Sequence, residues 1–81
     1  MMNFDEEIDK LEERFRDSEF RASVGPKQLR EIESTFIAMT KYLYELRKYE
    51  KSGEEESIEA AKLRVSVQEK IEQCRTMAGL E

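Results

Sequence analysis

The chain has 81 residues, of which 41% are charged and 38% are hydrophobic, and its formal net charge is −5. A chain of this size and polarity forms one small domain with a thin core, which usually needs a disulfide, a metal or another chain for stability. A single cysteine excludes a disulfide within the chain, and the lack of histidine removes the commonest metal ligand and the commonest general base.

One proline and three glycines divide the chain into segments rich in good helix formers, with no strand-like alternation. Gly25 and Pro26 separate the first segment from the second, Gly53 separates the second from the third, and Gly79 follows the third. These signals predict an all-α fold in a single domain over residues 1–81. We expect three helices, at residues 4–20, 26–52 and 54–78.

The first predicted helix can be capped by Asn3 together with Glu6, a pair that resembles a capping box. We interpret its acidic residues as a solvated face, and a detachable arm that finds a basic groove is the alternative. An isolated helix this short is marginal in water, so it has to dock on another element. Its apolar residues form a narrow seam with spacings of four, three and four: Phe4, Ile8, Leu11 and Phe15.

The second predicted helix begins at Pro26, which suits the first helical position. It ends before Gly53, which can adopt the left-handed conformation that follows many helices. Its apolar seam repeats at spacings of three and four without interruption: Leu29, Ile32, Phe36, Met39, Leu43 and Leu46.

This second helix carries more apolar surface than one neighbour can cover. Thr35, Tyr42 and Tyr49 lie on one flank of the seam, and Ile37 and Tyr44 lie on the other. Together the apolar and aromatic residues sweep roughly 240° of the helix, whereas a single neighbour covers about 100–140°. The rings are covered either by the first helix or by another molecule. The first helix has few regular apolar positions, which favours another molecule, and tyrosine is common at interfaces.

The third predicted helix has negative charge in its first turn, at Glu54–Glu56, where the helix dipole favours it. Ile58, Ala61 and Val65 form a second stripe nearly opposite the main one. That stripe contacts either the first helix or a loop, or another molecule, and both alternatives stay open. The main stripe consists of Ala60, Leu63, Val67, Ile71, Cys74 and Ala78.

Cys74 lies on this main stripe, and we interpret it as a buried free thiol, with a bridge to a second chain as the alternative. A lone free cysteine fits a reducing compartment. Residues 1–10 are acidic and lack the apolar run of a signal peptide, and no stretch approaches the ~20 apolar residues of a membrane span. We therefore expect a cytoplasmic protein without a membrane contact.

The short link around Gly53 predicts that the second and third helices return antiparallel as a long αα-hairpin, completed by oligomerisation or by a partner. The first helix is shorter and can cover only part of that hairpin. Residues 1–20 carry eight acidic and three basic side chains, residues 21–52 carry four and seven, and residues 53–81 carry seven and four. A basic helix between two acidic ones is complementary in charge, although each exposed pair contributes only ~0–1 kcal/mol.

The sequence does not predict an enzyme. A nucleophile needs a nearby base and an orienting group, and Ser-His, Cys-His and Glu-x-x-His arrangements are impossible without histidine. Neither a calcium-loop spacing nor a glycine-rich phosphate loop occurs. We expect no catalytic, cofactor-binding or metal-binding residues and no small-molecule substrate.

Four cations line the outer side of the second helix: Lys27, Arg30, Lys41 and Lys48. They could bind an acidic partner or nucleic acid, although the net charge and the acidic neighbouring helices argue against nucleic acid.

The remaining interpretation is a non-catalytic protein–protein interaction module, which presents an apolar face of the hairpin to a partner or to a second copy. A small dimeric helical regulator, associated with nucleic acid or of phage or plasmid type, is the alternative. The predicted partner-binding residues are Tyr42, Tyr44, Leu46, Tyr49, Ile58, Ala61 and Val65.

The stretch "FDEEIDKLEERF", the break at Gly25-Pro26 and the turn at Gly53 together resemble the layout of the small helical-hairpin co-chaperones of bacterial type III secretion. The resemblance covers the whole layout and includes no diagnostic motif. It implies a hairpin that joins a helical-repeat chaperone, so that the two together keep a needle subunit soluble.

Overall fold

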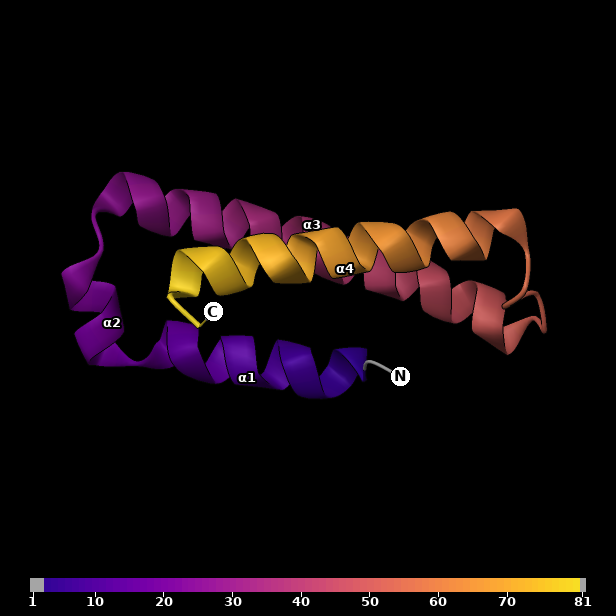
Figure 1. Ribbon diagram of the computed structural model, residues 1–81, viewed down its shortest axis with the longest axis horizontal. Helices are drawn as coiled ribbons and strands as arrows, with labels where there is room; N and C mark the ends of the chain where they lie inside the picture. Colours follow the sequence, from indigo (N-terminus) through magenta and orange to yellow (C-terminus); the bar gives the residue numbers. More distant parts are fainter. Residues whose placement is uncertain (1–2, 81) are drawn as a thin grey trace.

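The computed structural model describes residues 3–80, and the regular elements in this range are all helices. The all-α fold and its long antiparallel helix pair are confirmed. The predicted range of residues 1–81 also includes Met1, Met2 and Glu81, which lie outside the described residues. The helices are α1 (Phe4–Arg16), α2 (Ser18–Ser23), α3 (Pro26–Lys51) and α4 (Ile58–Ala78) (Figure 1).

The predicted first helix, 4–20, is wrong in its extent, because Asp17 divides it into α1 and α2. Asp17 has an extended backbone (φ −63°, ψ 119°), and its side chain accepts hydrogen bonds from the N–H groups of Glu19 and Phe20. Aspartate is among the best N-cap residues, so it ends one helix and begins the next. At the other end of α1, the Asn3 side chain accepts from the N–H groups of Asp5 and Glu6, which confirms the predicted cap.

The bounds of α3 agree with the predicted helix 26–52 to within one residue. Pro26 occupies its first turn, and Gly53 lies just beyond its end with φ +78°. The N–H of Glu54 donates to the Tyr49 carbonyl, and the N–H of Gly53 donates to the Glu50 carbonyl. These two bonds are a Schellman motif, which satisfies carbonyls that the helix end leaves free.

The predicted start of the third helix, at residue 54, is also wrong. Residues 54–56 lie in the turn, and Ser57 caps α4 by accepting a hydrogen bond from the N–H of Ala60 at 3.2 Å. The Ser57 side chain satisfies a backbone N–H that has no partner in the first turn of the helix. Glutamates placed inside the first turn would not supply this cap. At the other end, Gly79 adopts φ +69° and closes α4 as predicted.

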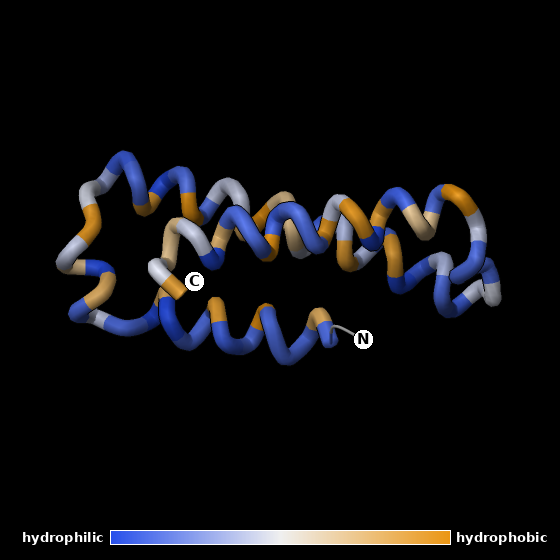
Figure 2. Tube along the Cα trace, in the orientation of Figure 1, coloured by the Kyte–Doolittle hydropathy of each residue, from blue (hydrophilic) through white to orange (hydrophobic). Residues whose placement is uncertain are grey.

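The core lies mainly between α4 and its two neighbours. Figure 1 shows α4 between α3 and α1, so the expected order with the second predicted helix in the middle is wrong. In Figure 2 the hydrophobic positions of α1 lie on the side that faces α4. The main buried cluster consists of Ile8, Leu11, Phe20, Ile32, Met39, Val67, Ile71, Cys74 and Ala78.

The molecule is elongated, with extents of 43 × 22 × 18 Å. The end of the hairpin that carries the α3–α4 turn extends beyond the N-terminus of α1 (Figure 1). That end is therefore a two-helix structure, whereas the opposite end has a third helix packed on it.

Candidate interaction surface

The docking of α1 determines how much of the α3–α4 hairpin the chain covers with its own residues. The Asp5 carboxylate pairs with the Arg47 guanidinium at 2.6 Å, and this contact ties the first turn of α1 to α3. Further along, the Arg14 side chain donates to the Ala78 carbonyl at 3.2 Å, at the end of α4. The helix α1 therefore follows the hairpin from the end of α4 to the level of Arg47, and the hairpin continues beyond it.

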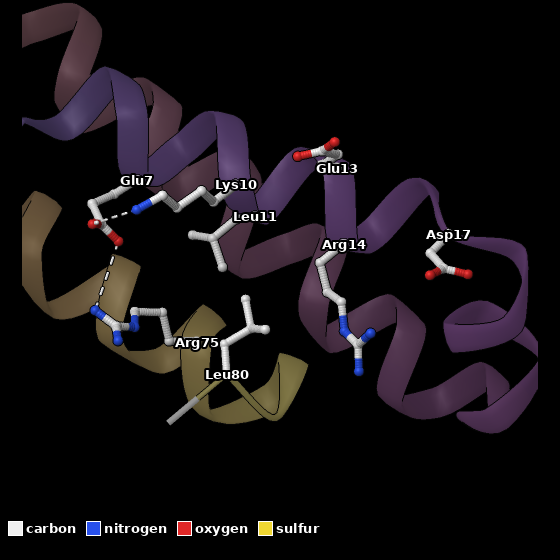
Figure 3. Close-up of a pocket in the computed structure, with 8 residues that line it drawn as sticks. All are labelled: Glu7, Lys10, Leu11, Glu13, Arg14, Asp17, Arg75 and Leu80. Atoms are coloured by element: carbon white, nitrogen blue, oxygen red, sulfur yellow. Dashed lines mark ion pairs between the residues drawn. The ribbon is translucent and has the colours of Figure 1, made fainter.

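A pocket of about 550 Å³ lies between α1 and the C-terminal end of α4 (Figure 3). In Figure 3 the Glu7 carboxylate lies between Lys10 and Arg75, and it pairs with them at 3.8 and 3.6 Å. The pocket is lined by three acidic and three basic side chains, so it offers no net charge to a charged ligand. We therefore interpret it as part of the docking of α1 rather than as a binding site.

Most of the predicted partner-binding residues lie on the surface. Tyr44, Ile58 and Val65 are 65%, 71% and 57% exposed, which is high for large apolar side chains. Tyr42 is 36% exposed, and Ala61 is exposed as well. Tyr49 is half-buried. The helix α1 thus leaves the Tyr44 ring largely open to solvent.

Leu46 is a correction to the predicted set, since only 1% of it is exposed. It lies seven residues after Met39, which is fully buried, and both face the interior of the hairpin. The uninterrupted seam of α3 already indicated burial at this position. Leu46 belongs to the core and is not available to a partner in this conformation.

Ile37 was absent from the predicted set although it is 59% exposed. Its position seven residues before Tyr44 places both side chains on the same outer side of α3. Ile58 and Val65 are likewise seven residues apart on α4. The exposed apolar residues thus include two rows, Ile37 with Tyr44 on α3 and Ile58 with Val65 on α4, while Tyr42 lies on another side of α3.

The predicted basic row on α3 is exposed throughout. The Lys48 ammonium pairs with Glu45 at 3.6 Å and lies 4.8 Å from the centre of the Tyr44 ring. Lys27, Arg30 and Lys41 make no ion pair with any residue in the range 3–80. Three cations of this row are thus free to meet an external anion.

Cys74 is a free, fully buried thiol, as predicted. Desolvation by burial raises its pKa to about 11, and the charge of Lys70 opposes this only in part. The thiolate is the reactive form of cysteine, so Cys74 is a packing residue rather than a nucleophile.

Within residues 3–80, no three histidine, cysteine, aspartate or glutamate side chains are grouped so that they could hold a metal ion. Over the same part of the chain, no helix combines the length and the apolar character that crossing a membrane requires.

Three comparisons with known proteins bear on the identity of the chain. No protein-family model matches it, and neither the curated proteins nor the solved structures include a significant match.

Proposed function

We propose that the protein is a small protein–protein interaction module, an adaptor or co-chaperone whose partner binds the outer faces of the α3–α4 hairpin. The observation that carries this proposal is that α1 covers only part of the α3–α4 hairpin, since α1 reaches α3 only as far as Arg47. Large apolar side chains stay exposed on both sides of that level, with Tyr44 one turn before Arg47 and Ile58 next to the α3–α4 turn, both more than half open. Apolar and aromatic side chains that stay exposed in rows are typical of protein interfaces.

The co-chaperone resemblance is a narrower version of this proposal. Its support is the layout of a short first helix followed by a long antiparallel pair, which the fold also has. In that version the partner is a helical-repeat chaperone. A small dimeric regulator is the alternative, in which the partner is a second copy.

The test is partner retention by the tagged, full-length chain, combined with the solution mass of the purified protein. We compare the wild type with a variant that carries Tyr44→Asp and Val65→Asp, which places charge on both rows. The control carries Gln28→Asp and Gln68→Asp, two exposed positions that give the same change in net charge. Circular dichroism checks that all three proteins are equally helical.

We expect the wild type and the control to retain a stoichiometric partner or to form a homodimer, and the Tyr44/Val65 variant to bind at least about tenfold more weakly. Two results would contradict the proposal. One is a wild-type protein that stays a 9.6 kDa monomer at all concentrations and retains nothing. The other is equal retention by the Tyr44/Val65 variant.

A further inference from the structure

Two depressions follow one another along the outer side of α3. The first, of about 400 Å³, lies where α1 and α2 meet α3, and Ile37 lines it. The second, of about 350 Å³, includes Tyr44 and Leu43 in its lining. Ile37 and Tyr44 are seven residues apart, so their backbone positions differ by ~10.5 Å along the helix axis.

The first depression is built on aromatic packing. The Phe15 ring meets the Phe36 ring edge-on, with centroids 6.0 Å apart and planes at 82°, and Leu29 adds aliphatic surface beside them. Phe15 also packs on the Phe20 ring of α2, with centroids 5.9 Å apart. Because three helices fix these rings, the depression exists before any partner binds.

Cations predominate around these two depressions, although the whole protein carries a net charge of −5. The linings include five basic residues, Arg16, Arg21, Arg47, Lys48 and Lys51, and two acidic ones, Glu12 and Glu33. Some of these cations already have an acidic neighbour within the chain, such as Arg16 with Glu12. Lys41 lies between Ile37 and Tyr44 in sequence on the same outer side, and it has no ion pair within residues 3–80.

We propose that this surface binds a single acidic, amphipathic helix of a partner protein, which lies along α3. Two apolar side chains of that helix, seven residues apart, enter the two depressions, and its acidic side chains face Lys41 and Lys48. Helices that dock in grooves use anchors at such spacings, and the spacing here matches that of Ile37 and Tyr44. The inference rests on the proposed function and adds the chemistry of the partner.

Two other occupants fit this surface less well. Nucleic acid would satisfy the cations, but it would leave the apolar walls of the depressions without a counterpart. A second copy of the chain offers an acidic helix in α1. However, the apolar seam of α1 is already used, because Ile8 and Leu11 are buried in the core.

The test uses ¹⁵N-labelled full-length protein and a synthetic helical peptide of about 18 residues, rich in glutamate and alanine, with leucines seven residues apart. A control peptide of the same composition has its leucines nine residues apart, on opposite faces. A duplex DNA of about 20 base pairs is the third probe. Chemical-shift titrations give both the affinity and the position of binding.

We expect the first peptide to bind, with shifts centred on residues 37–48. Ile37→Ser and Lys41→Glu should each weaken binding about tenfold. The matched variants Leu80→Ser and Lys62→Glu should change the affinity less than about twofold. Leu80 is an exposed apolar residue beyond the end of α4, at 38%, and Lys62 gives the same charge change on α4 as Lys41 gives on α3.

The inference is overturned if the first peptide shows no binding at about 1 mM, if the control peptide binds equally well, or if the Leu80 and Lys62 variants weaken binding as much as the α3 variants. Binding of the DNA through Lys41 without binding of the peptide would also overturn it. If the peptide fails while the tagged chain still retains a partner that the Tyr44/Val65 variant loses, the proposed function stands and only this inference fails.

Discussion

At the scale of single residues, neighbouring positions on α3 have opposite roles. Met39 is fully buried in the cluster between α3 and α4, whereas Ile37, two residues earlier, is 59% exposed. Two residues turn a helix by roughly 200°, so side chains that are two positions apart point to nearly opposite sides of the helix. Met39 lies on the buried seam, and Ile37 lies on the exposed flank. The same reasoning separates the buried Leu46 from the exposed Tyr44.

Met39→Ala should lower the free energy of unfolding by about 2–5 kcal/mol, because it removes buried atoms and leaves a cavity. Ile37→Ala should change it by less than about 0.5 kcal/mol, since the side chain contributes little to the core of the free protein. Urea denaturation followed by circular dichroism measures both. Similar losses in the two variants would show that Ile37 is buried in solution.

Cys74 predicts how stability depends on pH at the alkaline end. Burial raises the pKa of the thiol from 9.0 to about 11 in the folded chain, so the folded state holds its proton when the unfolded state has lost it. The stabilisation from this site is therefore complete below pH 9 and is lost as the pH rises towards 11. The difference in melting temperature between the wild type and Cys74→Ala should be constant below about pH 9 and should shrink as the pH rises towards 11, and a difference that does not change with pH would contradict the shift.

The same burial predicts that the thiol does not react with a disulfide reagent at pH 8 in the native protein. It should react fully in guanidinium chloride, because unfolding exposes it and restores its ordinary pKa.

At the scale of the elements, the sequence-based prediction of helix bounds depended on recognising N-cap residues and helix-breaking residues. The bounds of α3 follow from Pro26 and Gly53, which have conformational roles that are readable without tertiary contacts. The division at Asp17 was missed because the acidic run hid an N-cap residue. One signal was present, since Phe20 follows Phe15 at a spacing of five and so falls outside the helical repeat.

Gly25 and Gly79, which flank different helices, differ in the backbone conformation that they adopt. Gly79→Ala should destabilise the protein by about 1–2 kcal/mol, because φ is +69° there and an L-residue pays for the left-handed conformation. Gly25 precedes α3 in an extended conformation without a side-chain cap, and nothing lies within 4 Å of an added Cβ. Gly25→Ser should therefore stabilise the protein by a few tenths to about 1 kcal/mol through a new N-cap bond. Thermal denaturation measures both changes, and a neutral Gly79→Ala would contradict the first.

The docking of α1 depends on few buried side chains, so it should be separable from the hairpin. Leu11 is 1% exposed, and Leu11→Ala should cost about 2–5 kcal/mol of docking free energy. A free 13-residue helix is marginal in water, so the amide protons of α1 should exchange much faster in this variant. The exposed Glu13→Ala is the control. Hydrogen exchange read by mass spectrometry should show the increase in α1 first, and an equal increase in α3 and α4 would show that the three helices open together.

At the scale of the whole molecule, the order of helix packing could not be predicted from charge. The segment charges favoured a basic helix between two acidic ones, yet α1 packs mainly on α4. Three of the glutamates that made the third segment acidic lie in the turn before α4, and α4 itself carries three acidic and four basic side chains. Burying a leucine or isoleucine side chain contributes about 1.5–3 kcal/mol, whereas an exposed ion pair contributes about 0–1 kcal/mol. Apolar burial at Ile8 and Leu11 therefore contributes more to the docking of α1 than any one exposed ion pair, and only the tertiary structure shows which groove accepts these side chains.

The candidate interaction surface was predicted only in part, because the sequence does not show how the helices pack on one another. Helical periodicity identified Tyr44, Ile58 and Val65 as side chains that the core does not need, and each is exposed. Periodicity could not show how far α1 reaches, so it could not separate the covered part of α3 from the open part. The depression beside Ile37 depends on the packing of α1 and α2 on α3 and has no signature in the sequence, whereas the depression beside Tyr44 is lined by residues of α3 alone.

The outer side of α3 should face solvent in the free chain and be covered when the partner binds. Hydroxyl-radical footprinting of the full-length protein, alone and in the complex retained by the tagged chain, measures this at each tyrosine. We predict that Tyr44 is oxidised fastest of the three tyrosines in the free protein and becomes several-fold slower in the complex. A Tyr44 ring that is slow to oxidise in the free protein, or equally reactive in both states, would contradict the account.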